Sequence, residues 1–179
     1  MANQVKWVFD PTHSEITFKV KHLMITNVKG EFKKLEVSLT SEDDQLTNAV
    51  ATASIELSSI STNNEDRDGH LKGPDFFDVA NHPTIEFESS SIEKLDDDNA
   101  HLKGKLTIKG ITKEVSFDLE LGGFSKDPWG NEKAGFSLNG KINRNDFGLT
   151  WNAALETGGV LLSEDVKIAA EIQFVKQVV

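Results

Sequence analysis

Histidine, cysteine and arginine are the residue types whose number and spacing would most readily reveal a reactive centre. The chain has no cysteine, so neither thiolate catalysis nor a thiolate metal site is possible. Its five histidines lack the short spacing on one strand or helix that metal sites use, and the motifs of serine hydrolases and nucleotide-binding enzymes are missing. We therefore expect a protein that is not an enzyme and that needs no metal or cofactor. The histidines are His13, His22, His70, His82 and His101.

The two arginines, Arg67 and Arg144, are candidates for a polar contact with a ligand. A guanidinium offers a fixed fork of donors, so either arginine could clamp a phosphate or carbonyl headgroup. The alternative is structural, because Asp66 and Asp68 flank Arg67 and Asp146 lies near Arg144. Such local pairs are common and could simply hold loop and barrel together.

The overall charge narrows the choice of partners. A formal net charge of −10 repels phosphate, so the sequence favours neither a nucleic-acid partner nor electrostatic docking on anionic lipid headgroups. The amino end has no basic segment followed by an apolar one, and no apolar run is long enough for a membrane span. We expect a cytoplasmic protein without stable membrane insertion, the alternative being a periplasmic or secreted one from which a signal segment was removed.

Alternation of apolar and polar residues dominates the chain and predicts strands with one buried face. Ile16, Phe18, Val20 and His22 would point inward together, so His22 is either a polar contact in a pocket or a hydrogen-bonded core residue. The parity of the pattern shifts after Lys33-Lys34, which indicates a β-bulge. Similar segments over 28–39, 51–57, 100–108, 115–121, 134–142 and 166–174 bring the total to eight or nine strands.

Closure of these strands into a barrel is the expected architecture, because long strands that close on themselves leave no free edges. The predicted fold is all-β: an extended, lipocalin-like antiparallel barrel of about eight strands, with one or two short helices. One helix is expected over 64–71, after a possible N-cap at Thr62-Asn63 and before a stop at Gly73-Pro74. No linker divides the chain, so a single domain is expected over 1–179.

The interior of such a barrel can be filled by side chains or can hold one small ligand. The inward positions mix large phenylalanines with glycine and alanine, and none carries a run of charges. The small residues leave room in the interior, which favours an apolar ligand pocket. Each phenylalanine taken alone could equally be a residue of the hydrophobic core. The small inward residues are Gly30, Ala51, Ala53, Gly104 and Gly140.

Several distinctive motifs follow one another along the chain. The opening Asp10-Pro11-Thr12-His13-Ser14-Glu15-Ile16 is followed by Val20-Lys21-His22-Leu23 and Val28-Lys29-Gly30-Glu31-Phe32. The middle block has Ser59-Ile60-Ser61-Thr62, Arg67-Asp68-Gly69-His70-Leu71, Asp75-Phe76-Phe77-Asp78-Val79 and His82-Pro83-Thr84-Ile85-Glu86-Phe87-Glu88-Ser89. The later motifs are Gly104-Lys105-Leu106-Thr107-Ile108-Lys109-Gly110-Ile111-Thr112, Ile142-Asn143-Arg144-Asn145-Asp146-Phe147-Gly148 and Ser163-Glu164-Asp165-Val166. Together these motifs resemble the YceI-like family of polyisoprenoid-binding, lipocalin-like bacterial proteins.

The resemblance implies an elongated apolar cavity for isoprenoid-type lipids, no cofactor, and commonly a homodimer. The expected function is therefore to bind, and to sequester or carry, a polyprenyl lipid or an isoprenoid quinone. Arg67, His70 and Arg144 are the candidate headgroup contacts. The expected ligand-binding residues are Phe18, Val20, His22, Phe32, Ile55, Leu57, Phe76, Phe77, Phe87, Phe117, Phe136, Ile142, Asn143 and Trp151.

Two other functions remain open at this point: a stress-related structural protein with a filled barrel, and an enzyme that acts on an isoprenoid lipid. A polar constellation deep in the pocket would favour the enzyme, and only His22, Thr52 or Asn143 are near the right places. For the ligand, the charge of −10 disfavours an anionic diphosphate and favours a neutral or weakly polar headgroup.

Overall fold

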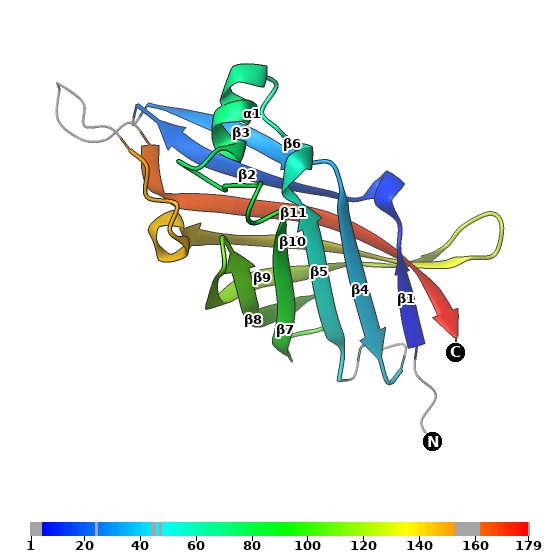
Figure 1. Cartoon of the computed structure of the whole chain (residues 1–179). Coiled ribbons are helices and arrows are strands. Elements are labelled where there is room, and N and C mark those ends of the chain that lie inside the picture. Colours follow the sequence, from blue (N-terminus) through cyan, green and yellow to red (C-terminus); the bar gives the residue numbers. More distant parts are fainter. Residues whose placement is uncertain (1–4, 24, 44–45, 47, 153–161, 179) are drawn as a thin grey trace.

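The computed structural model describes residues 5–23, 25–43, 46, 48–152 and 162–178, which fold into an antiparallel β-barrel (Figure 1). Helix α1 lies across one end, and the β9–β10 hairpin extends beyond the wall at the other end, where both termini lie. The strands are β1 (Val5–Phe9), β2 (Glu15–His22), β3 (Thr26–Phe32), β4 (Leu35–Ser41), β5 (Val50–Glu56), β6 (Ile60–Ser61), β7 (Thr84–Lys94), β8 (Asn99–Ile108), β9 (Ile111–Lys126), β10 (Glu132–Asn143) and β11 (Leu162–Val178).

The helical elements are short and lie at breaks or ends of the wall. Helix α1 (Glu65–Lys72) begins after an N-cap at Asn64, whose side chain accepts a hydrogen bond from the backbone of Arg67, and it ends at Gly73. The helix predicted over 64–71 is confirmed, but the cap is Asn64 rather than Thr62-Asn63. The 3-10 helices are η1 (Pro11–His13), η2 (Leu57–Ser59) and η3 (Arg144–Phe147).

The strands β1 to β6 combine in twos, so that β1 with β2, β3 with β4, and β5 with β6 each form one interrupted strand of the barrel wall. β1 and β2 both pair with β11, β4 pairs with β1 where β3 pairs with β2, and β5 pairs with β4 where β6 pairs with β3. With β7 to β11 this gives eight antiparallel positions among the described residues, and the β1–β11 and β2–β11 pairings close the ring. The bulge expected at Lys33-Lys34 is wrong: the two lysines lie outside the strands and separate β3 from β4.

The tight β8–β9 turn shows how the sequence sets these connections. Lys109 and Gly110 both have positive φ, 54° and 76°, as a two-residue hairpin turn requires. Glycine adopts this backbone without steric cost. The pairing Ile108↔Ile111 then fixes the register of the whole β8–β9 ladder.

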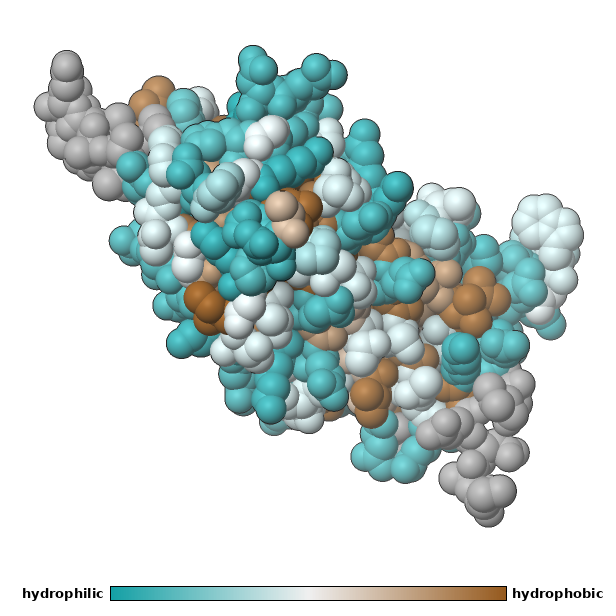
Figure 2. Space-filling view, viewed as in Figure 1, coloured by the Kyte–Doolittle hydropathy of each residue, from teal (hydrophilic) through white to brown (hydrophobic). Residues whose placement is uncertain are grey.

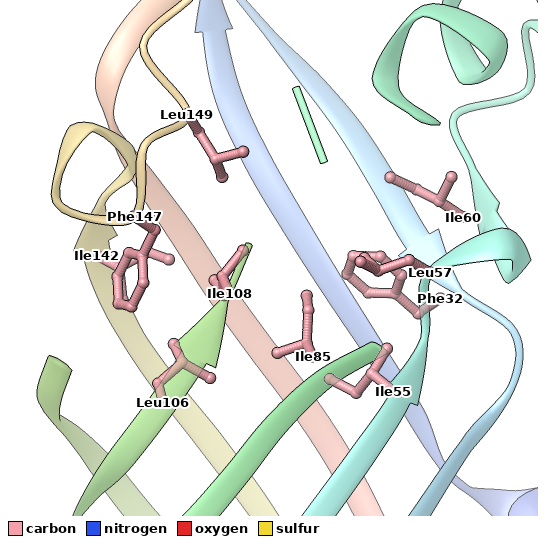
Figure 3. Packing of buried hydrophobic residues seen from close by; sticks show 10 residues of the cluster. All are labelled: Phe32, Ile55, Leu57, Ile60, Ile85, Leu106, Ile108, Ile142, Phe147 and Leu149. Carbon is pink, nitrogen blue, oxygen red and sulfur yellow. The ribbon is translucent and has the colours of Figure 1, made fainter. Parts of the chain in front are cut away.

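The inward side chains form two clusters that give the two ends of the barrel different characters. Near the termini, Trp7, Leu39, Phe136 and Phe174 pack together and fill the interior. Toward α1, a second cluster comes from strands on opposite sides of the wall, and its side chains point inward around a central space (Figure 3). The outer surface is largely hydrophilic around α1, and hydrophobic residues show mainly toward the end with the termini (Figure 2).

Asp10 stabilises the junction between β1 and β2. Its carboxylate accepts hydrogen bonds from the backbone and hydroxyl of Thr12 at 3.0 and 2.7 Å, and its Oδ2 lies 2.8 Å from Nδ1 of His13. The Thr12 hydroxyl in the first place, together with His13 and the Thr12 backbone, lowers the pKa of Asp10 to about 2. Because the folded-state pKa is depressed, the unfolded chain binds the proton more readily, and the carboxylate contributes stability above about pH 4.

We predict that Asp10→Asn lowers the free energy of unfolding by about 1 kcal/mol at neutral pH, a value reduced from the full shift because the junction is partly screened by solvent. The deficit should shrink as pH falls from about 4 to about 2, since the wild-type carboxylate is then protonated as well. Urea denaturation at several pH values measures this, with the exposed Asp97→Asn as control. A deficit that stays constant down to the lowest pH would contradict the assignment.

Candidate functional site

A continuous cavity of about 400 Å³ lies inside the described part of the barrel, and it extends from the α1 end to Val37 and Ile172 beside the filled end. Every wall position contributes to its lining, which is mostly aliphatic and aromatic. Arg67 and His70 line it and are also solvent-exposed, so the cavity reaches the surface beside α1. The volume falls within the range of small-molecule sites in proteins.

Three phenylalanine–glycine pairs keep the centre of this cavity open. The rings of Phe18, Phe87 and Phe117 lie against Gly30, Gly104 and Gly140 of the neighbouring strands, so closely that a Cβ at any of these glycines would overlap the ring. Each ring therefore occupies space that a neighbouring side chain would otherwise take, and it lies along the wall. The sequence allowed either a filled barrel or an apolar pocket, and the structure combines large and small inward residues so that a void remains.

Aromatic rings gather at the open end of the cavity. The His70 ring lies edge-on to both Phe76 and Trp151, with centroid distances of 5.0 Å in each case, and Phe76 and Trp151 are 5.4 Å apart. Nε2 of His70 is 3.0 Å from Oδ2 of Asp75, which orients the imidazole. The entrance thus presents flat apolar surfaces with one polar edge.

Arg67 stands at the same entrance and is held by Thr62. Its Nε donates to the Thr62 hydroxyl at 2.8 Å, and its Nη2 donates to the Thr62 carbonyl at 2.7 Å. Asp68 accepts from the backbone and hydroxyl of Thr62, at 2.8 and 2.6 Å, rather than from Arg67. The local pairing considered for Arg67 therefore runs through Thr62, and the guanidinium remains at the surface of the cavity mouth.

Arg144 has a structural environment instead. Its side chain is 3% exposed, and its guanidinium donates to the carbonyls of Leu149, Trp151, Ser163 and, at 3.5 Å, Leu162. Burial lowers its pKa, and Glu164 partly offsets that effect. The expected partner Asp146 plays no part in these contacts. With its donors directed at main-chain carbonyls, Arg144 fastens the segment after η3 to the start of β11.

The structure places most of the sequence-predicted site residues on the cavity wall and excludes three. Phe136 belongs to the filled end, Leu57 is fully buried within the inward cluster toward α1 without lining the cavity, and Asn143 caps η3 through the backbone of Asn145. The predicted residues that do line the cavity are Phe18, Val20, His22, Phe32, Ile55, Phe76, Phe77, Phe87, Phe117, Ile142, Trp151, Arg67, His70 and Arg144.

Sequence reasoning missed several lining residues. Leu106, Ile108 and Ile168 were already assigned inward by alternation, so the same signal could have named them. Thr62 and Leu149 lie in segments where apolar and polar residues do not alternate, so alternation gives no indication that they line the cavity.

The fold and the cavity define a lipocalin-like barrel, closed at one end by core packing and open at the other to an apolar cavity. The model of the YceI-like domain matches residues 7–174. A UPF0312 protein of Staphylococcus epidermidis is 45% identical over 170 residues, which cover 94% of this chain and 96% of that protein. The chain therefore belongs to the YceI-like domain family.

Solved structures agree with this assignment. The YCEI protein of Campylobacter jejuni is 35% identical, with a TM-score of 0.76 and coverage of 88% of this chain and 90% of that one. A polyisoprenoid binding domain from Saccharophagus degradans, implicated in plant cell wall breakdown, has a TM-score of 0.71 at 15% identity, with coverage of 97% and 98%. At that identity the second likeness shows the fold alone.

The phenylalanine–glycine pairs make a direct prediction. Gly140→Ala should push the Phe117 ring into the lumen and weaken binding of an apolar fluorescent dye about tenfold, because overpacking of this kind typically costs about 1–3 kcal/mol. Gly135→Ala on the same strand is the matched control, since nothing lies within 4 Å of a Cβ there. Fluorescence titration measures both. Unchanged dye affinity in Gly140→Ala, or an equal loss in Gly135→Ala, would contradict this role for the glycine.

Proposed function

We propose that this protein binds a long-chain isoprenoid lipid, either a polyprenyl lipid or an isoprenoid quinone, with the apolar chain inside the barrel. The observation that carries the proposal is the open, apolar cavity between Phe18, Phe87 and Phe117. Family membership and the polyisoprenoid binding domain of Saccharophagus degradans support the choice of ligand class. The role that fits such a site is to sequester or carry the lipid.

The headgroup would lie at the entrance beside α1. The faces of Phe76 and Trp151 suit a planar ring, and the guanidinium of Arg67 and the imidazole of His70 supply donors beside them. A neutral or weakly polar headgroup fits this arrangement best, because the protein as a whole carries a charge of −10 and Arg67 is already engaged by Thr62. An isoprenoid quinone has such a headgroup.

Binding rather than catalysis is the function that the site supports. The lining of the cavity is mostly aliphatic and aromatic, and its ionisable side chains on α1, Arg67 and His70, are exposed at the entrance. The imidazole of His70 packs perpendicular to the rings of Phe76 and Trp151, and the carboxylate of Asp75 orients it.

Native mass spectrometry of protein purified without detergent tests the proposal. We expect an added mass equal to that of an isoprenoid lipid, and micromolar to nanomolar affinity when the delipidated protein is titrated with a long-chain quinone. The binding should change little with ionic strength, because apolar burial provides most of it. An empty mass together with no measurable rebinding would contradict the proposal.

Arg67→Ala separates the two kinds of headgroup. For a neutral quinone the variant should lose less than about 1 kcal/mol of affinity, whereas a phosphate clamp would lose about 2 kcal/mol or more. Lys113→Ala, an exposed cation outside the cavity lining, is the control. Tighter binding of a prenyl diphosphate than of the quinone to the wild type, together with a large loss for the diphosphate in Arg67→Ala, would overturn the preference for a neutral headgroup.

A further inference from the structure

Four lysines form a row across one side of the barrel. The strand registers place Lys141 opposite Lys167, Lys167 opposite Lys19, and Lys19 opposite Lys29, on the adjacent strands β10, β11, β2 and β3. All four side chains are exposed. With neighbouring strands about 4.8 Å apart, the row extends for roughly 14 Å. We call it the lysine row.

Like charges directly opposite one another destabilise a sheet, so the fold gains nothing from this arrangement. The wall formed by β7, β8 and β9 follows the ordinary rule, because its corresponding row is Glu88, Lys105 and Glu114, with alternating signs. In a chain of net charge −10, a row of one positive sign is therefore a local exception. Protection of a free edge does not account for it, because β10, β11 and β2 are interior strands.

Acidic groups near the row only partly neutralise it. Lys141 lies 3.8 Å from Asp165, and Glu164 is close by on β11. Glu31 follows Lys29 by two residues on β3, and Glu15 and Glu171 face one another two rows further from the cavity entrance. Lys21, exposed on β2, adds a fifth cation on the entrance side.

The strands that carry Lys19 and Lys29 end in an apolar tip at the cavity entrance. Their connecting turn exposes Leu23 and Ile25, which are 40% and 76% exposed. Leu23 has a φ of 54°, a strained backbone for a bulky residue. It directly follows His22, which lines the cavity, and the turn lies at the same end of the barrel as α1 (Figure 1).

We propose that the lysine row and this apolar tip together dock the protein on an anionic lipid bilayer, with the cavity entrance turned toward the lipid. Lysines near such a surface are attracted by the acidic headgroups, and Leu23 and Ile25 enter the boundary between headgroups and acyl chains. The charge complementarity is local, so it holds despite the negative charge of the protein as a whole. The docking goes beyond the proposed lipid binding and would stand if the cavity held a different ligand. No helix among the described residues is long and apolar enough to cross a membrane, and contact at the surface needs none.

Flotation of the ligand-free protein with vesicles tests the docking. We expect binding to vesicles of phosphatidylcholine mixed with phosphatidylglycerol, weaker binding to phosphatidylcholine alone, and loss of the difference at high salt. Replacing Lys19, Lys29 and Lys167 by glutamine should weaken binding to the anionic vesicles roughly 100-fold, at about fivefold per lysine. The melting temperature should stay the same or rise, because repulsion is relieved.

The matched control replaces Lys103, Lys105 and Lys126 of β8 and β9 by glutamine, which changes the net charge by the same amount away from the lysine row. Equal losses in both triple variants, or no binding of the wild type to anionic vesicles, would overturn the proposal. A change of oligomeric state in the first triple variant without a change in vesicle binding would also overturn it, since the row would then be an interface between copies.

Ile25→Ser tests the orientation. The variant should bind anionic vesicles about tenfold more weakly, because the isoleucine side chain loses its burial in the lipid boundary. Unchanged binding in this variant would overturn the placement of the entrance toward the lipid. Because flotation uses protein without a cavity ligand, failure of the docking and failure of isoprenoid binding are observed separately.

Discussion

Packing of phenylalanine rings onto glycines is the constraint on which the cavity depends. An eight-stranded barrel has an interior just wide enough for its own side chains to fill it or for one small ligand to enter. In the filled end, Trp7, Phe136 and Phe174 occupy the interior. In the other end, Gly30 and Gly140 provide shallow recesses for Phe18 and Phe117, so the rings add apolar surface without occupying the centre. The same residue type thus fills one end and lines the other.

The rest of the architecture keeps that open end in place. Breaks at η1 and η2 let the first strands pair with different partners along their length, and the long strand β11 spans both ends of the barrel. Arg144 joins the segment after η3 to β11 through carbonyl groups, and Thr62 joins α1 to the wall through Arg67 and Asp68. The entrance is therefore framed by polar contacts, while the cavity behind it is apolar.

The sequence predicted the architecture well because alternation reports directly which face of a strand is buried. The antiparallel closure, the short helix and the inward direction of Phe18 and Phe117 follow from that period and from turn residues. The alternation did not predict the strands β1 and β7. The alternation does not predict how far along the barrel axis a residue lies. Phe136 alternates like Phe117, yet it lies in the filled end, because its depth depends on the registers of β9, β10 and β11 together.

The alternation of apolar and polar residues also could not predict contacts that depend on tertiary packing. Arg144 has an acidic neighbour in sequence, but its donors find main-chain carbonyls that only the folded chain brings together. The lysine row is a similar case: each lysine is an ordinary outward residue of its strand, and their alignment appears only when four strands are in register. The expectation of no attraction to anionic lipid rested on the net charge alone. The net charge does not show that positive charges gather on one side of the barrel.

A crystal structure of the protein with a long-chain isoprenoid quinone would show directly whether the open end of the barrel holds the prenyl chain. We expect continuous density for the prenyl chain between Phe18, Phe87 and Phe117, with these rings still against their glycines and the quinone ring beside Phe76 and Trp151. Rings turned into the lumen with no chain between them, or a ligand bound only outside the barrel, would contradict this expectation.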